Sequence, residues 1–218
     1  MINSVIFDMD GVLVDSEEAI TLAGIEALES WGIDAKPEDF KPFTGMGEDK
    51  FIGGVAEKHG VPFTFAMKDK AYEIYVATAK ERITVYPWSK PVLDGMAQRG
   101  IKIALASAAD AVKVVCNLAC IGVDKSIFSA LVTGSDVTHK KPHPEIFLTA
   151  ARKAGFDPSQ TLVVEDALSG VKAAKSAGML CLGLTTSFAE SELRKAGADF
   201  VSHTPDDIFD IIKNDNNT

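Results

Sequence analysis

The sequence predicts an α/β fold, a doubly wound parallel sheet into which an all-helical domain is inserted. In the second half of the chain, short apolar segments alternate with helix-length amphipathic segments, a pattern typical of parallel strands joined by right-handed crossovers. The 218 residues, 46% of them hydrophobic, suffice for a core domain that carries a smaller second domain. The first two strands are separated by far more chain than one crossover helix needs, which predicts the insertion.

Apolar segments bounded by turn residues define the expected strands. They are Ser4–Asp8, Ile101–Ser107, Ala130–Thr133, Thr161–Glu165, Met179–Leu184 and Asp199–Val201. The helices expected between them are Pro91–Arg99, Asp110–Gly122, Pro144–Ala154, Ser169–Ala177 and Ala189–Ala196. Because a sheet built in this way is covered by helices on both faces, ligands are expected at the carboxyl ends of its strands.

The interval after the first strand is predicted to form a helical cap domain of residues 16–84, between core segments 1–15 and 85–218. The apolar residues have helical spacing in Glu17–Trp31, Glu48–His59 and Phe65–Arg82. The segments Val12–Asp15 and Val85–Ser89 are the expected hinges. A cap of this kind closes over the carboxyl edge of the sheet and excludes water from a substrate.

Composition and charge restrict the function. A formal net charge of −9 and the lack of a basic stripe argue against nucleic acid and anionic lipid as partners, so a small molecule is the expected ligand. No run reaches the roughly 18 apolar residues of a membrane span, and no signal peptide is evident. Three cysteines, an odd number, fit a reducing compartment, so the expected location is the cytoplasm. We expect a monomer or a weak homo-oligomer with a disordered polar tail, Asn214–Thr218.

Two aspartates stand at the end of the first predicted strand. Asp8 closes the strand, and Asp10 follows on a tight turn that Gly11 permits. Carboxylates this close repel each other, and such hard oxygen ligands suit Mg²⁺, which takes one or two carboxylates and keeps several waters. The alternative is that both residues only close a strand and start a turn, and the pair taken alone favours that alternative.

Further polar residues end two other strands. Glu165 and Asp166 are expected at the same sheet edge as Asp8, where repulsion and desolvation favour a metal over an empty acidic cluster. The Ser107 hydroxyl and the backbone N–H groups that follow it, from Ala108 onward, form an anion site where they lead into a helix. A helix cap without a ligand is the alternative for this serine.

The stretch HKKPHPEIF places Lys140 and Lys141 in a loop that opens a helix. A lysine held there can balance phosphate charge, whereas a surface lysine pair by itself usually means a solvated face. His139 and His143 lie four positions apart, but the neighbouring prolines prevent one helical face from presenting both. A zinc-binding histidine pair is therefore not expected.

Four segments, DMDGVLVDSEE, LASAAD, KKPHPEIF and VVEDALSGVKAA, resemble in order and spacing the four motifs of the haloacid dehalogenase-like superfamily. The chain resembles the branch with a helical cap between the first two motifs, which includes phosphoglycolate phosphatase-like and beta-phosphoglucomutase-like proteins. The resemblance covers essentially the whole chain. It implies a Rossmann-like core and a Mg²⁺-dependent phosphatase that hydrolyses a small phosphorylated metabolite through an aspartyl-phosphate.

The resemblance also implies roles for single residues. Asp8 is the nucleophile, and Asp10 is the general acid and base whose main-chain carbonyl also contacts Mg²⁺. The metal site is completed by Asp166 with Glu165, and the phosphoryl oxygens are held by Ser107 and Lys141, with Gly11, Ala108, Thr44 and Gly45 as further substrate-binding residues. These roles fit phosphoryl transfer, which requires positioning and charge compensation above all.

Two alternatives to the phosphatase stay open. The mutases hold a second phosphate with a histidine in the first cap helix and with basic residues in the cap, where this chain has Ile20 and, in TGMGEDKF, Glu48. A mutase is therefore less favoured, although Lys50 could substitute for the missing cations. The other alternative is a non-catalytic protein that binds a phosphorylated ligand.

Overall fold

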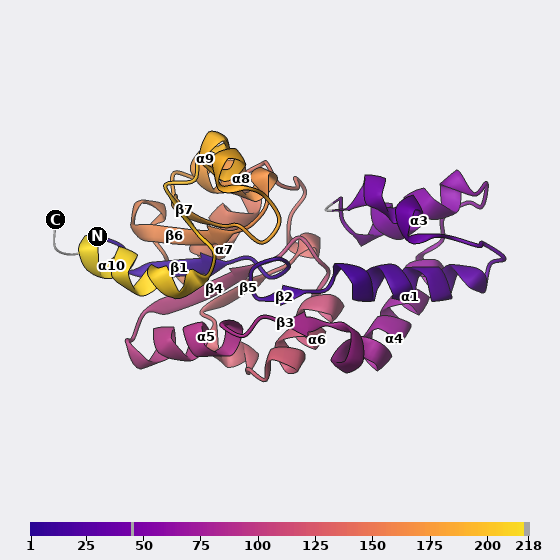
Figure 1. The fold of residues 1–218 in the computed structure, drawn as a ribbon, viewed down its shortest axis with the longest axis horizontal. Helices are drawn as coiled ribbons and strands as arrows, with labels where there is room; N and C mark the ends of the chain where they lie inside the picture. The colour runs from indigo at the N-terminus through magenta and orange to yellow at the C-terminus, as the bar shows by residue number, and fades with distance from the viewer. Residues whose placement is uncertain (45, 216–218) are drawn as a thin grey trace.

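The computed structural model describes residues 1–44 and 46–215, and it confirms the predicted fold class (Figure 1). Six parallel strands form one sheet in the order β5-β4-β1-β6-β7-β8. Their bounds are β1 Ser4–Phe7, β4 Lys102–Ala106, β5 Ala130–Val132, β6 Thr161–Glu165, β7 Leu180–Leu184 and β8 Phe200–Ser202. Ser4 pairs with both Lys102 and Thr161, so β1, β4 and β6 run level and their carboxyl ends meet at one edge.

Helices cover both faces of the sheet (Figure 1). One face packs against α5 (Ser89–Gln98), α6 (Ala111–Ile121) and α10 (Ile208–Asp215), and the other against α7 (Glu145–Ala154), α8 (Leu168–Ser176) and α9 (Glu190–Ala196). Side chains of a strand alternate between faces, so Val5 and Phe7 contact the first group and Ile6 the second. Burial on both faces explains why β1 is apolar throughout.

In its described residues, the long interval after β1 contains four helices: α1 (Glu17–Glu29), α2 (Pro37–Phe40), α3 (Glu48–Lys58) and α4 (Phe65–Arg82). They enclose an apolar cluster of their own that includes Leu28, Phe40, Ile52 and Tyr75. The three helices expected here are present, and α2 is an addition that four residues are too few to reveal by periodicity. Because these helices have an apolar cluster of their own, we propose that residues 16–84 form a cap domain and the rest of the chain a core domain.

A two-stranded ribbon joins these helices to the sheet. β2 (Val14–Asp15) pairs antiparallel with β3 (Thr84–Val85) in the segments expected to be hinges. The Trp88 indole N–H donates a hydrogen bond to the Val12 carbonyl at 2.9 Å, and Ser89 donates to the Leu13 carbonyl. Ser89 thereby starts α5 two residues before the predicted Pro91.

The predicted disordered tail is partly wrong. Asn214 and Asp215 belong to α10, whose Ile208 and Ile212 lie four positions apart and are buried. The Asp215 carboxylate forms an ion pair with the amino terminus of Met1 at 3.0 Å, which places the two ends of the described chain side by side. Residues 216–218 of the expected tail lie outside the described residues.

Short 3₁₀ turns complete the fold at Lys41–Phe43, Lys125–Ile127, Gly134–Asp136, Pro158–Gln160 and Pro205–Asp207. Within residues 1–44 and 46–215, no helix combines the length and the apolar character that a membrane crossing requires. The part of the fold that positions the site is therefore the level carboxyl edge of β1, β4 and β6, with the α1–α4 helices beside it.

Candidate active site

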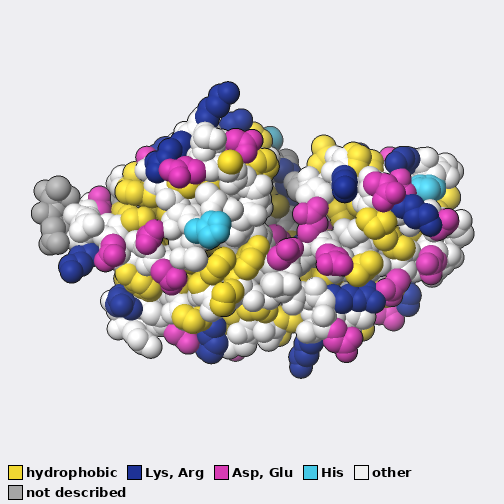
Figure 2. Space-filling model, viewed as in Figure 1, with side chains coloured by type: hydrophobic (Ala, Val, Ile, Leu, Met, Phe, Trp, Pro, Cys, Tyr) yellow, Lys and Arg dark blue, Asp and Glu magenta, His cyan; other side chains and the backbone are white. Residues whose placement is uncertain are grey.

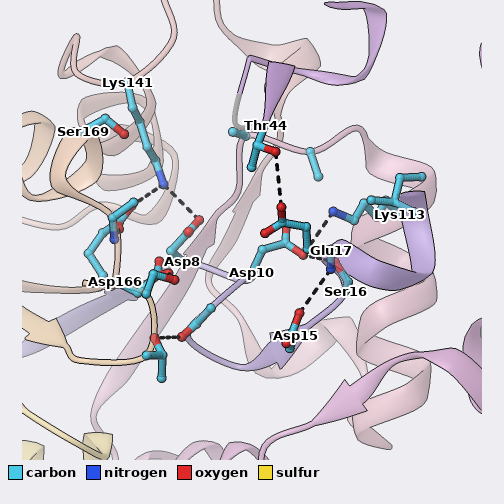
Figure 3. Close-up of a pocket in the computed structure, with 18 of the residues that line it drawn as sticks. Asp8, Asp10, Asp15, Ser16, Glu17, Thr44, Lys113, Lys141, Asp166 and Ser169 are labelled. Carbon is cyan, nitrogen blue, oxygen red and sulfur yellow. Dashed lines mark hydrogen bonds and ion pairs between the residues drawn. The ribbon is translucent and has the colours of Figure 1, made fainter. Parts of the chain in front are cut away.

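A cavity of about 800 Å³ lies between the carboxyl edge of the sheet and the cap helices, and Figure 3 shows its side chains. The surface in Figure 2 is indented between the two halves of the molecule. The core contributes Asp8, Asp10, Gly11, Ala108, Lys141, Glu165 and Asp166, and the cap contributes Glu17, Ile20, Thr44, Glu48 and Phe51. The predicted core residues, Ser107 excepted, thus line one cavity.

Asp8 follows β1 directly and is almost fully buried. Its backbone N–H donates to the Val164 carbonyl at 3.0 Å, which continues the ladder to β6 and fixes where the side chain emerges. Burial raises the pKa of the Asp8 carboxyl, and the positive charge of Lys141 opposes that rise. A cation beside Asp8 therefore favours the ionised form that a nucleophile requires.

Lys141 supplies that cation. Its Nζ lies 3.0 Å from Asp8 Oδ1 and 2.6 Å from Glu165 Oε1, and it stands over the Phe147 ring, 5.0 Å from the centroid. Burial alone would lower the pKa of Lys141, but the carboxylates of Asp8 and Glu165 outweigh burial and hold this pKa above its usual range. The ammonium group therefore stays charged beside Asp8.

Glu165 holds Lys141 in place. The side chain is fully buried at the end of β6, and its second oxygen, Oε2, accepts the Ala167 backbone N–H at 2.7 Å. It lies against Gly170, where any side chain would collide with the carboxylate. Oε1 of Glu165 already binds a cation, the Lys141 ammonium, at 2.6 Å, which favours a positioning role over the predicted role as a metal ligand.

Asp166 lies beside Asp8 at the neighbouring strand end, and one oxygen each of Asp8, Glu165 and Asp166 can be chosen within 4.8 Å of one another. Burial raises the pKa of Asp166 well above its usual value, and the nearby charges of Glu165 and Asp8 raise it further. Ser187 donates a hydrogen bond to Asp166, and Gly11, at φ +77°, leaves the space that the carboxylate occupies.

The donor set at this edge fits a hard divalent cation. Asp8 and Asp166 offer two buried carboxylates. Burial raises the pKa of each, and the charge of Glu165 raises both further, so a bound Mg²⁺ would supply positive charge that this edge of the sheet needs. Asp8 and Asp166 are therefore the residues best placed to hold Mg²⁺, whereas Glu165 forms an ion pair with Lys141.

Asp10 is the most accessible carboxylate of the DMD segment and turns towards the cap (Figure 3). Its Oδ1 accepts a hydrogen bond from Ser16 and lies 3.1 Å from Lys113 Nζ. Burial alone would lower the pKa of Lys113, but Asp10 and Glu48 raise it above the usual value. Lys113 was not predicted as a site residue. The available signal was a lysine four residues before Asn117 on the buried face of a largely apolar helix.

Ser107 lies beneath the cavity surface, which Ala108 and Ala109 form. The Ser107 side chain is buried, its Oγ accepts the Ala109 N–H at 3.1 Å, and its own N–H donates to the Val132 carbonyl at 3.0 Å. These bonds shape the loop between β4 and α6. The phosphate-binding role of Ser107 stays a prediction, and Ala108 is where the loop reaches the cavity.

On the cap side, Thr44 lines the cavity and its hydroxyl donates to Glu17 Oε1 at 3.2 Å. The predicted partner of Thr44, Gly45, lies outside the described residues. Ile20 and Glu48, the two positions at which a mutase was expected to carry cations, both line the cavity. Burial raises the pKa of Glu48, and the charge of Lys113 opposes the rise.

Residues 2–178 match the haloacid dehalogenase-like hydrolase family, and the chain belongs to that family. Its enzyme class is phosphohydrolase. Within the family, it falls in the branch of the phosphoglycolate phosphatase-like and beta-phosphoglucomutase-like proteins, as the four sequence motifs predict.

The chain is 38% identical over 98% of its length to the protein SUPPRESSOR OF QUENCHING 1, chloroplastic, of Arabidopsis thaliana, of which it spans only 20%. It is 32% identical to the phosphorylated carbohydrates phosphatase of Thermotoga maritima, over 96% of this chain and 98% of that protein. The crystal structure of a beta-phosphoglucomutase from Clostridium difficile superposes with a TM-score of 0.79 at 25% identity, covering 100% and 98% of the two chains.

Proposed function

We propose that this protein is a Mg²⁺-dependent phosphatase that hydrolyses a small sugar phosphate or similar phosphomonoester through an aspartyl-phosphate on Asp8. The observation that carries the proposal is the buried Lys141 ammonium, held by Glu165 and directed at Asp8. The relationship to a phosphatase of phosphorylated carbohydrates supports the substrate class. Mg²⁺, when bound by Asp8, Asp166 and the main-chain carbonyl of Asp10, supplies positive charge to the phosphoryl oxygens.

In the first half of the reaction, a carboxylate oxygen of Asp8 attacks phosphorus and the bond from phosphorus to the ester oxygen breaks. Asp10 donates its proton to the departing oxygen, which leaves as an alcohol. Lys141 compensates charge on the transferring group, and the backbone of Ala108, which lines the cavity, binds it. The cap helices exclude water other than the molecule used in the second half.

In the second half, Asp10 accepts a proton from a water molecule that attacks the phosphorus of the aspartyl-phosphate. The bond between phosphorus and Asp8 breaks, and inorganic phosphate leaves. Asp10 is suited to both proton transfers because Ser16 and Lys113 fix its carboxylate at the cap-facing side of Asp8. One carboxylate thus acts as nucleophile and the other as acid and base.

Phosphate release from a panel of small phosphate esters tests the proposal. We expect release from sugar and polyol monophosphates in the presence of Mg²⁺ and loss of release after chelation, since two raised-pKa carboxylates are left uncompensated without a cation. Inorganic phosphate is measured against time with and without Mg²⁺. Silence on every ester, or release that chelation does not change, contradicts the proposal.

The mutase alternative has less support. The cations among the described cavity-lining residues are Lys113 and Lys141, and both are paired with carboxylates. Lys50, the proposed substitute, is exposed and does not line the cavity. A second phosphate would therefore meet Glu17 and Glu48 without a compensating charge. Isomerisation of beta-glucose 1-phosphate with little phosphate release would restore this alternative.

Glu48 is expected to select substrates whose remainder is an uncharged polyol. A buried carboxylate accepts hydrogen bonds from hydroxyl groups and repels a carboxylate or a second phosphate. Glu48→Gln is expected to lower kcat/KM for sugar monophosphates about tenfold, the value of one charged hydrogen bond, and to relax rejection of sugar bisphosphates. The exposed Glu57 on the same helix provides the matched control, Glu57→Gln. Equal kinetics for the two variants would contradict this role.

The remaining expectations on partners and location are proposals as well. Lys and Arg side chains are interspersed with acidic ones on the face shown in Figure 2, which supports a small-molecule ligand rather than nucleic acid. The cytoplasmic location and the monomeric or weakly oligomeric state stay predictions.

A further inference from the structure

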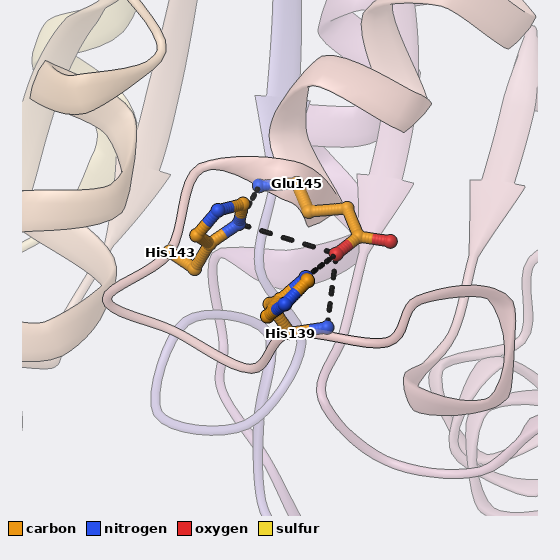
Figure 4. Close-up of side chains that lie close together, drawn as sticks. All are labelled: His139, His143 and Glu145. Atoms are coloured by element: carbon orange, nitrogen blue, oxygen red, sulfur yellow. Dashed lines mark hydrogen bonds and ion pairs between the residues drawn. The ribbon is translucent and has the colours of Figure 1, made fainter.

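Three side chains gather at the loop that carries Lys141 and at the start of α7, outside the cavity (Figure 4). His139 Nδ1 lies 2.8 Å from Glu145 Oε2, and His143 Nδ1 lies 4.0 Å from the same oxygen. The imidazole rings are 4.5 Å apart between centroids. As predicted, no helical face presents the two histidines, since both lie before α7, yet their rings lie side by side. They meet through a turn, closed by the His143 N–H on the Lys140 carbonyl at 3.0 Å, and not on a helix face.

The three donors match the ligands of a borderline transition metal. Two imidazole nitrogens and one carboxylate oxygen are a recurrent Zn²⁺ set, with ligand distances of about 2.0–2.2 Å that place tetrahedral donors roughly 3.3 Å apart. The observed separations of 2.8 and 4.0 Å lie on either side of that value. His143 Nδ1 also accepts the Glu145 backbone N–H at 3.3 Å, so this ring must give up that bond and rotate to close the site. Both histidine side chains are more than half exposed, which leaves room for water as a fourth ligand. Mg²⁺, in contrast, prefers all-oxygen sites.

The carboxylate of this group is held in advance. Glu145 Oε1 accepts the Thr138 N–H at 3.0 Å, and Oε2 accepts the His139 N–H at 2.9 Å. These two backbone bonds, followed by the bond to the His139 ring, lower the pKa of Glu145 to about 2. The carboxylate is therefore ionised and fixed in orientation. Carboxylates that bind metal ions are commonly oriented by hydrogen bonds in this way.

Two neighbouring features oppose a cation at this position. Glu145 starts α7, and a helix start carries partial positive charge. The acidic first-turn residue Glu145 itself offsets that charge. The second feature is the cationic side chain of Lys140, but its Nζ donates to the Gly134 carbonyl at 2.6 Å and is engaged there. The balance leaves the His139, His143 and Glu145 group able to accept a divalent ion.

We propose that His139, His143 and Glu145 bind one Zn²⁺ ion, or a transition-metal ion of the same ligand preference, and that this ion fixes the loop carrying Lys141. His139 lies two residues before Lys141 and His143 two residues after it. An ion shared by both therefore clamps the two ends of the segment that presents the ammonium group to Asp8. The site is separate from the carboxylate cluster and independent of the substrate.

Calorimetric titration of tag-free protein with Zn²⁺, in excess Mg²⁺ to fill the carboxylate cluster, tests the proposal. We expect one bound Zn²⁺ per chain with micromolar or tighter affinity, and at least a tenfold loss of affinity in His139→Ala and in His143→Ala. His203→Ala removes an exposed histidine elsewhere and is expected to keep the binding, as is Asp8→Asn. Bound Zn²⁺ should also raise the melting temperature of the wild type and not that of the double variant His139→Ala/His143→Ala.

Two results would overturn the proposal. One is a wild type that takes up no Zn²⁺ under these conditions. The other is uptake that the double variant retains unchanged, since the ion would then lie at another site. Thermal unfolding of each variant without metal checks that the variant folds. We expect it to fold, because both histidines are exposed and neither belongs to an apolar cluster.

Discussion

Asp8→Asn is expected to abolish phosphate release, with kcat reduced by roughly 10⁴-fold or more, the scale seen when a nucleophile is removed from an enzyme. An amide cannot attack phosphorus to give a stable acyl phosphate, and it loses the charge that pairs with Lys141 at 3.0 Å. The fold should persist, because Asn has the same shape and relieves repulsion with Glu165 and Asp10. Steady-state phosphate release and thermal unfolding measure both effects.

A trapping experiment distinguishes a nucleophilic role of Asp8 from a role as a metal ligand alone. Acid quenching of the wild type during turnover should yield a protein-bound phosphate that hydroxylamine releases, as expected for an acyl phosphate on Asp8. Asp8→Asn should yield none. Asp69→Asn, which changes an exposed aspartate on α4, is the matched control and should behave as the wild type. Phosphate release that survives Asp8→Asn would remove Asp8 from the nucleophile position.

The gathering of Asp8 and Asp166 could be expected from the sequence because it follows from topology, whereas Lys141, in the loop before α7, was expected there from the resemblance of KKPHPEIF to a family motif. Parallel strands in a doubly wound sheet end at one edge, and apolar runs that stop at carboxylates mark those ends. The register that pairs Ser4 with Lys102 and Thr161 then brings the ends level. Hydrophobic periodicity was therefore enough to predict the six strands and the longer helices. The positions of the strand ends were enough to predict where Asp8 and Asp166 gather.

What escaped prediction depends on burial and on turns. The sequence does not distinguish a buried lysine such as Lys113 from a solvated one, and only tertiary packing brings Lys113 into its ion pair with Asp10. Ser187 reaches Asp166 from a loop after β7, across a long separation in sequence. Prolines correctly exclude a helical His139 and His143 pair, but a turn brings the rings together by a route that helical periodicity does not describe.

Lys141→Ala is expected to have the second largest effect, through both catalysis and stability. Loss of a cation directed at the transferring group should lower kcat about 10²–10³-fold. The substitution also leaves Glu165, which is fully buried, without its charged partner at 2.6 Å, and breaking such a pair costs about 3–5 kcal/mol of unfolding free energy. Lys140→Ala is the matched control, since Lys140 bonds the Gly134 carbonyl instead.

The double variant Lys141→Ala/Glu165→Gln separates the two effects. Glutamine removes the buried charge and can still accept the Ala167 N–H, so denaturant unfolding should show that much of the stability lost in Lys141→Ala returns. The activity should not return, because no cation then faces Asp8. If stability and activity recovered together, the loss in Lys141→Ala would be a folding defect, and Lys141 would have no role in charge compensation. If neither recovered, Glu165 would serve the site beyond holding Lys141, as the metal-ligand role predicted from the sequence requires.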